Sequence, residues 1–89
     1  NVGAVVEYLG VPVGAVTDIR VTDIDTARVE IEVDTTKVIL RKGVQAETVL
    51  FSLATGVLYI SLSGGEADQP ELMPYSQIPT APSLTSSLI

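Results

Sequence analysis

The side chains of this sequence that could do chemistry are mostly oxygen ligands, and Asp18, Asp23 and Asp25 lie close together among them. Hard cations such as Ca²⁺ bind several such oxygens at once. The spacing, however, lacks the glycine and the distal glutamate of a recognised calcium loop. We therefore interpret this segment as an ordinary acidic turn and expect no metal site.

Side-chain catalysis has few groups to draw on, because the 89 residues include no His and no Cys. A catalytic site would have to be built from Ser, Thr, Lys, Tyr and carboxylates alone. Gly64 and Gly65 precede no helical pattern, so they do not predict a phosphate-binding loop. We expect a protein that is not an enzyme, with no catalytic residues and no cofactor.

Length and charge limit the chain to one domain and narrow its possible partners. The net charge of −6, with only five Lys and Arg, argues against nucleic acid, whose binding needs clustered basic residues. No apolar run is long enough to cross a membrane, and no signal peptide is present. Because the chain starts at Asn1 without a Met, we expect it to be a fragment of a longer protein from which any targeting segment has been removed.

The elements that must position any site are predicted to be short strands, because apolar and polar residues alternate and no helical period occurs before residue 80. In the plainest strand, Val29, Ile31 and Val33 are expected to point inward and the two glutamates outward. Gly10 and Pro12 are expected to end the first strand. The expected strands are residues 2–9, 15–21, 28–33, 44–51 and 58–62, with a short candidate at 75–78. The apolar residues 38–40 are compatible with either a brief strand or a plug under the core. Six or seven short strands predict an all-β fold, a small closed or nearly closed β-barrel.

Two polar segments complete the expected organisation. Residues 63–70 are expected to form an exposed loop that is too polar and flexible to pack. From residue 80 onward the Pro, Ser and Thr content predicts a linker, and Ser83 followed by leucines is typical of a helix start. We therefore assign residues 1–79 to the barrel domain and residues 80–89 to a linker or the start of a C-terminal helix.

The stretch from Leu50 to Ala54 is apolar on both sides and leads into a turn signal, Thr55-Gly56. One interpretation is that it ends a strand that is buried on both faces. The other is that its side chains leave the domain's own core and meet another molecule. Exposed apolar side chains on an acidic monomer would favour aggregation unless a partner covers them.

Four segments carry patterns that occur together, in order and at matching spacing, over roughly residues 3–83. They are Glu7 to Val16 continuing to Ile19, which reads L-G-V-P-V-G-A-V-T-D-I from residue 9; Val29 to Asp34 with Ile39 and Ala46; Gly56 to Gly65, with G-x-x-Y-I-x-L; and Ile78-Pro79 followed by Pro82-Ser83. No single pattern is specific. Together they resemble the Mce/MlaD (mammalian cell entry) domain family.

The resemblance implies a small seven-stranded β-barrel that assembles into a homohexameric ring with a central pore. It also implies lipid, most simply phospholipid, as the substrate of an ABC transporter with separate permease and ATPase subunits. The implied location is the periplasmic side of the bacterial inner membrane, with an N-terminal anchoring helix. In such rings the loop before the G-x-x-Y-I-x-L strand lines the pore, which here means Phe51, Leu53, Ala54 and Thr55. This loop departs from the family's common G-L-x-G form, which displaces its apolar side chain by one position.

Two functions are compatible with these observations. The first is a lipid-conducting ring without chemistry of its own, in which acyl chains leave water at about 0.8 kcal/mol per buried methylene. The alternative is a structural or interaction barrel that scaffolds a membrane complex without contacting lipid itself. Replacing Phe51 or Leu53 with Asn would separate the two.

Overall fold

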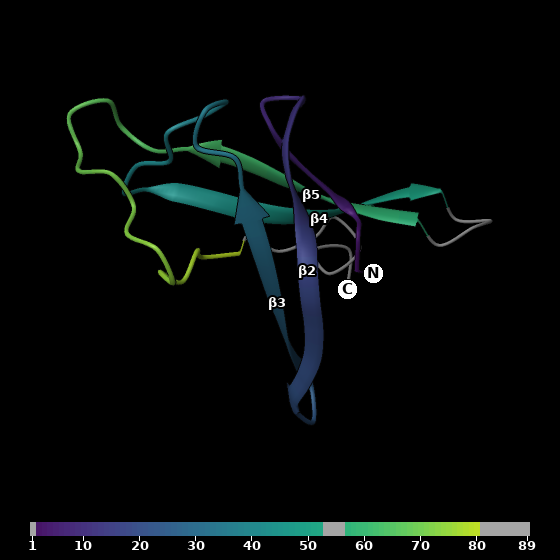
Figure 1. Ribbon diagram of the computed structural model, residues 1–89. Helices are drawn as coiled ribbons and strands as arrows, with labels where there is room; N and C mark the ends of the chain where they lie inside the picture. The colour runs from purple at the N-terminus through teal and green to yellow at the C-terminus, as the bar shows by residue number, and fades with distance from the viewer. Residues whose placement is uncertain (1, 53–56, 81–89) are drawn as a thin grey trace, which may run out of the picture.

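The computed structural model describes residues 2–52 and 57–80, with the backbone alone at residues 50–52 and 57. The described residues contain five strands: β1 (Val5–Tyr8), β2 (Val11–Asp23), β3 (Thr26–Val33), β4 (Val44–Ser52) and β5 (Val57–Gly64). They form one sheet in the order β3-β2-β1-β5-β4, which curls into a half-barrel (Figure 1). The predicted all-β class is confirmed. Five strands are found in this part of the chain, so the closed seven-stranded barrel stays a prediction.

Two antiparallel hairpins, β2–β3 and β4–β5, are joined through the short strand β1. Strand β1 pairs antiparallel with β2 and parallel with β5, where Val6 lies opposite Ile60 and Tyr8 opposite Leu62. This parallel pair links the start of the chain to its last strand. The β2–β3 hairpin consequently runs across the direction of β4 and β5 and projects away from them (Figure 1).

The core is aliphatic and built from small side chains, as the scarcity of aromatic residues requires. Its buried members are Ala4, Val6, Val13, Val16, Val44, Ala46, Ile60 and Leu62. Val38 and Leu40 pack against this core without forming a strand, so residues 38–40 act as the plug that was one of two expectations for them. Val29 differs from the prediction, because it is 42% exposed although Ile31 and Val33 pack inward.

Strand β2 is longer than the alternation predicts, and it contains both Pro12 and Gly14. We expected Pro12 to interrupt the strand pattern, but it lies inside β2. The pairing of β2 with β1 shifts register at Val6/Glu7, and proline is tolerated at such irregular positions. Gly14 lies so close to β3 that a Cβ atom there would collide with the Glu32 carbonyl oxygen. The glycine therefore permits the two strands to approach, rather than marking a turn.

The segment 63–70 packs against the rest of the domain, contrary to the sequence-based expectation. The Lys42 amide donates to the Pro70 carbonyl at 3.0 Å, and the Arg41 guanidinium donates to the Gln69 carbonyl at 3.0 Å. The positive φ angle of Gly65 brings its backbone against Arg41. Backbone hydrogen bonds hold this loop, and they are invisible to an argument from side-chain polarity.

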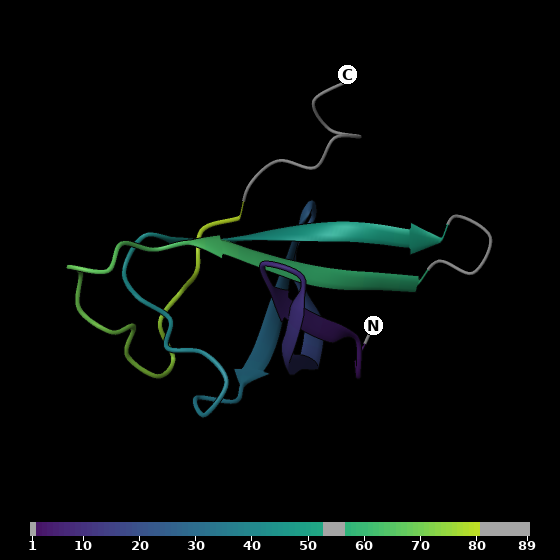
Figure 2. The same ribbon diagram turned by 90° about the horizontal axis from the view of Figure 1, so that it is seen from above.

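The predicted strand at 75–78 is also absent. Tyr75 has a φ of 66° and a fully exposed side chain, which is incompatible with a regular strand. The chain instead returns to the sheet at Thr80, which bridges to Ala46 in parallel while the Ala46 amide donates to the Pro79 carbonyl at 2.9 Å. Figure 2 shows this last described segment meeting the β4–β5 hairpin near the end of β5.

Candidate functional site

The β4–β5 hairpin positions the segment that the sequence singled out. Val44 pairs with Gly64 at one end, and Ser52 pairs with Val57 at the other. In Figures 1 and 2 the Ser52–Val57 end extends beyond the rest of the sheet. In the sequence, residues 53–56 join β4 to β5 at this end of the hairpin, and they lie outside the described residues.

The end of the hairpin at Val44 and Gly64 is fixed by burial. Val44, Ala46, Ile60 and Leu62 are all buried, and they come from both strands. A slip of one residue in the register would turn these side chains to the solvent, so the pairing is strongly specified. The direction of the whole hairpin, and hence the placement of its far end, follows from this anchorage.

The predicted pore residues fall at the far end. Phe51 belongs to β4 and lies between Leu50 and Ser52, where the register of the β4–β5 pair shifts. Leu53, Ala54 and Thr55 lie outside the described residues. The role assigned to these four residues from the sequence therefore stays a prediction.

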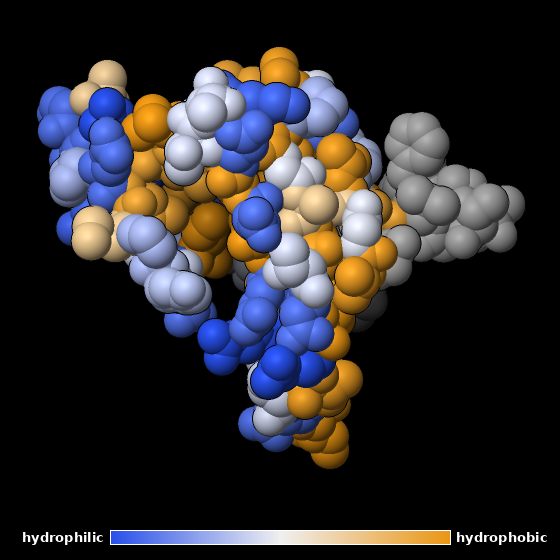
Figure 3. Space-filling view, viewed as in Figure 1, coloured by the Kyte–Doolittle hydropathy of each residue, from blue (hydrophilic) through white to orange (hydrophobic). Residues whose placement is uncertain are grey.

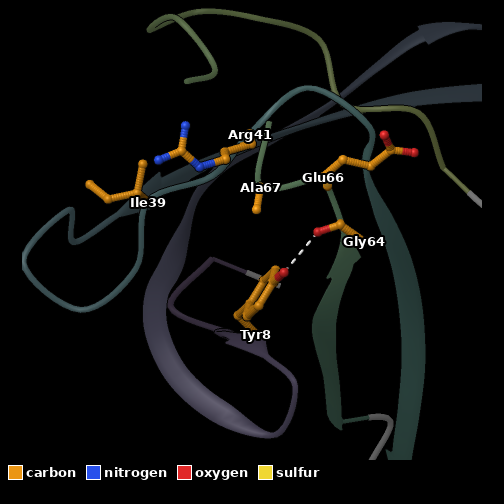
Figure 4. A pocket seen from close by; sticks show the side chains of 7 residues that line it. Tyr8, Ile39, Arg41, Gly64, Glu66 and Ala67 are labelled. Atoms are coloured by element: carbon orange, nitrogen blue, oxygen red, sulfur yellow. Dashed lines mark hydrogen bonds between the residues drawn. The ribbon is translucent and has the colours of Figure 1, made fainter. Parts of the chain in front are cut away.

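At the Gly64 end of β5 lies a small open pocket of about 220 Å³. It is lined by Tyr8, Ile39, Arg41, Gly64, Gly65, Glu66 and Ala67. Figure 4 shows the ring of Tyr8 pointing toward Gly64, whose carbonyl accepts the phenol hydrogen at 2.7 Å. Arg41 already donates to the Gln69 carbonyl, and Figure 4 shows its guanidinium turned away from Tyr8. These polar groups tie strand ends together, so we assign this end of the domain a structural role that the sequence did not reveal.

The three aspartates of the acidic turn each bond locally and do not converge. Asp18 accepts from Arg20 Nε at 3.0 Å and Nη2 at 2.6 Å, and this hydrogen bond holds the pKa of the Asp18 carboxyl below its usual value. Asp23 accepts from the Ile24 amide at 2.7 Å, and Asp25 accepts from Thr26 Oγ1 at 3.2 Å. Within the described ranges, no group of three or more Asp or Glu side chains could hold a metal ion. The contacts of Asp23 and Asp25 are those of turn-forming aspartates, whereas Asp18 makes a surface ion pair within β2.

Asp34 makes a similar local cap after β3. Its Oδ1 accepts from the Thr36 amide at 2.9 Å and from the Thr36 hydroxyl at 2.6 Å. These bonds lower the pKa of the Asp34 carboxyl, because they favour its charged form. The exposed carboxylates of this region therefore organise turns, and none of them faces the pocket.

Residues 1–65 match a family model described as MlaD protein, a span that includes all five strands and the connection between β4 and β5. No curated protein matches the chain. Over residues 2–52 and 57–80 there is no helix long and apolar enough to cross a membrane.

Proposed function

Since this chain belongs to the MlaD family, whose model matches residues 1–65, we propose that it binds lipid and passes it through the pore of a homohexameric ring. The family membership suggests a component of lipid transport and is the single observation that carries the proposal. In this role the domain is the substrate-binding part of an ABC transporter, and phospholipid is the expected cargo. It acts on the periplasmic side of the inner membrane, where an N-terminal helix in another part of the protein anchors it.

The arrangement of the β4–β5 hairpin supports this proposal. One end of the hairpin is held by buried side chains, and the other extends past the sheet. A hairpin anchored in this way can hold Leu53, Ala54 and Thr55 at the axis of a ring, with Phe51 beside them. Six copies would then surround an apolar channel, where each methylene of an acyl chain that leaves water contributes about 0.8 kcal/mol.

In the proposed mechanism the domain performs no chemistry of its own and is not an enzyme. A separate ATPase and a permease supply the energy and the membrane passage, and this domain supplies the apolar path. In the ring, a neighbouring copy would cover the β4 edge of the half-barrel. Such coverage removes exposed strand edges, which otherwise promote aggregation.

The alternative function, a scaffold that does not contact lipid, is favoured by one observation. The β2–β3 hairpin exposes Val21 and Ile24, which are 80% and 96% accessible. Exposed aliphatic side chains on a projecting hairpin are typical of interaction surfaces. Both functions require assembly, so a measurement of lipid itself must separate them.

The test replaces Leu53 with Asn in the membrane-anchored protein and compares it with Val21→Asn as a matched control. Both changes convert an aliphatic side chain to an amide, but only residue 53 belongs to the proposed pore. We expect Leu53→Asn to lower co-purified lipid roughly tenfold, as the loss of apolar contacts with an acyl chain predicts, while native mass spectrometry shows an unchanged ring. Phe51→Asn should act in the same direction.

Unaltered lipid in both pore variants, with the ring intact, would favour the scaffold. Equal loss of lipid in Val21→Asn and Leu53→Asn would show that the loss is not specific to the proposed pore, and it would overturn the assignment of lipid contact to Leu53. Quantitative lipid extraction followed by mass spectrometry identifies the cargo in the same experiment.

A further inference from the structure

The β2–β3 hairpin has two chemically different faces. Ile19, Val21 and Val29 lie on one face, and the ion pairs Arg20–Asp18 and Arg28–Glu30 lie on the other. In Figure 3 the projecting hairpin is accordingly orange along one side and blue along the other. The apolar face continues the side on which Ile31 and Val33 pack against the core. The hairpin therefore extends a core-type face beyond the core.

Strand β3 is an edge of the sheet. Among the described residues, the backbone hydrogen bonds of β3 run only to β2. The Glu30 carbonyl accepts from Thr17 Oγ1 of β2 at 3.3 Å, so it points to the paired side. Backbone groups alternate along a strand, so those of Val29 and Ile31 point to the open side. An exposed strand edge of this kind is a template for pairing with another chain.

The charges of β3 select one register for pairing with a copy of itself. In an antiparallel pair centred on Val29, Arg28 lies opposite Glu30 of the second copy, and Glu30 lies opposite its Arg28. Opposite charges in such cross-strand positions stabilise the pair, and like charges destabilise it. Centring the pair on Arg28 puts Arg28 opposite Arg28, and centring it on Glu30 puts Glu30 opposite Glu30 although it also brings Arg28 opposite Glu32. Of these three registers, only the one centred on Val29 pairs opposite charges without facing like charges.

We propose that β3 pairs antiparallel with β3 of a second copy of this chain, about a two-fold axis at Val29. The two Val29 residues exchange backbone hydrogen bonds, and Ala27 lies opposite Ile31 on the apolar face. The Arg28–Glu30 pairs within each strand, now 3.5 Å apart, gain partners across the axis. The contact joins the two hairpins into one longer sheet with a continuous apolar face.

This contact is distinct from the ring of the proposed function. A two-fold contact uses the same surface on both copies, whereas a six-membered cyclic ring needs two different surfaces on each copy. In a ring, the β3 contact would therefore join one ring to another. It can form or fail regardless of whether lipid passes through the pore.

Disulfide trapping tests the contact directly, because the chain contains no cysteine of its own. Val29→Cys in the full chain places two thiols at the axis, where the Cα atoms of a hydrogen-bonded antiparallel pair are about 5.5 Å apart. We expect mild oxidation to give a covalent dimer. Ala27→Cys is the matched control, because its two copies would be separated by four strand positions, about 13 Å.

Charge reversal gives an independent readout by sedimentation or native mass spectrometry. Arg28→Glu alone and Glu30→Arg alone should each weaken self-association through β3 roughly tenfold, because residues 28 and 30 of the two copies then carry like charges. Mixing the two variants should restore self-association, since every facing pair is again of opposite charge. Arg20→Glu is the control, because it reverses the same charge on the same face of the hairpin but on β2. Circular dichroism verifies that each variant is folded.

A Val29→Cys protein that stays monomeric, or that cross-links no better than Ala27→Cys, overturns the proposal. So does a mixture of the two charge variants that associates no more than either variant alone. Unaltered lipid in Leu53→Asn together with efficient cross-linking of Val29→Cys would overturn the pore proposal and leave the β3 contact standing.

Discussion

The two long hairpins of this domain are built from similar residues but are stabilised in different ways. The β4–β5 hairpin contributes Val44, Ala46, Ile60 and Leu62 to the core. The β2–β3 hairpin leaves the core after Val16 and Ile31, and beyond that point both of its faces are largely exposed. One hairpin is held by burial, and the other by strand pairing, surface ion pairs and a turn.

The difference shows that alternation of apolar and polar residues determines which face a side chain takes but not whether that face is covered. Val29 and Leu62 both belong to well-alternating strands, yet Val29 is 42% exposed and Leu62 is 0% exposed. Burial of an aliphatic side chain contributes about 1.5–3 kcal/mol, and a side chain left in solvent contributes little. The uncovered face is available for a partner, which is why the two hairpins suit different tasks.

The strongest test of this comparison removes one aliphatic side chain from each hairpin. Leu62→Ala should destabilise the domain by about 2–5 kcal/mol, because it leaves a cavity in the core. Val21→Ala should change the free energy of unfolding by no more than about 0.5 kcal/mol. Urea denaturation followed by circular dichroism measures both. Similar losses in the two variants would mean that the β2–β3 hairpin is covered in solution.

A second test concerns the point at which the β2–β3 hairpin leaves the core. Gly14→Ala should cost about 3 kcal/mol, because its Cβ atom would meet the Glu32 carbonyl oxygen, which is backbone and cannot move aside cheaply. Gly10→Ala is the comparison, since open space surrounds it and only its positive φ angle opposes a side chain, at about 1–2 kcal/mol.

Hydrogen exchange distinguishes these two causes. In Gly14→Ala the amides of β3 should exchange faster, because β3 must move away from β2. In Gly10→Ala the effect should stay at the turn between β1 and β2. Unchanged protection of β3 in Gly14→Ala would show that the close approach of the two strands is not maintained in solution.

A third test concerns the anchored end of β5. Tyr8→Phe removes the hydroxyl that donates to the Gly64 carbonyl at 2.7 Å, and it should cost about 1 kcal/mol. Tyr75→Phe is the matched control, because the Tyr75 side chain is fully exposed. Thermal unfolding of both variants gives the difference. Equal midpoints would mean that water replaces this hydrogen bond without loss.

The sequence predicted the parts of the fold that side-chain patterns govern. The strands at 28–33, 44–51 and 58–62 correspond to β3, β4 and β5 within a few residues, because each has one apolar face. It did not predict that β2 continues through Pro12 and Gly14, since a register shift and a close backbone approach depend on the neighbouring strand. The packing of 63–70 was missed for a related reason, because backbone groups hold it.

The candidate site was predictable only in part. The four patterns together pointed to the family, and the match over residues 1–65 confirms the family. The pore role proposed for Leu53, Ala54 and Thr55 would depend on neighbouring copies, which the pattern of a single chain does not show. The two-faced nature of the β2–β3 hairpin was also missed, because the structure alone shows that the side chains of Ile19 and Val21 are exposed.

The smallest expected effect is the acid dependence that the exposed hairpin contributes. The hydrogen bond from Arg20 keeps the pKa of Asp18 lower in the folded protein than in the unfolded chain. The stabilisation is therefore fully present above the unfolded value, about pH 3.9, and is lost as the pH falls through the lower folded value. Because both side chains are largely in solvent, screening keeps the contribution small. Asp18→Asn should thus reduce the fall in urea midpoint below pH 4 slightly, and Asp34→Asn should act in the same direction through the lost bonds from Thr36.

A double variant with the unchanged acid dependence of the parent would assign that dependence to other carboxylates and remove the ion pairs from the forces that hold the β2–β3 hairpin.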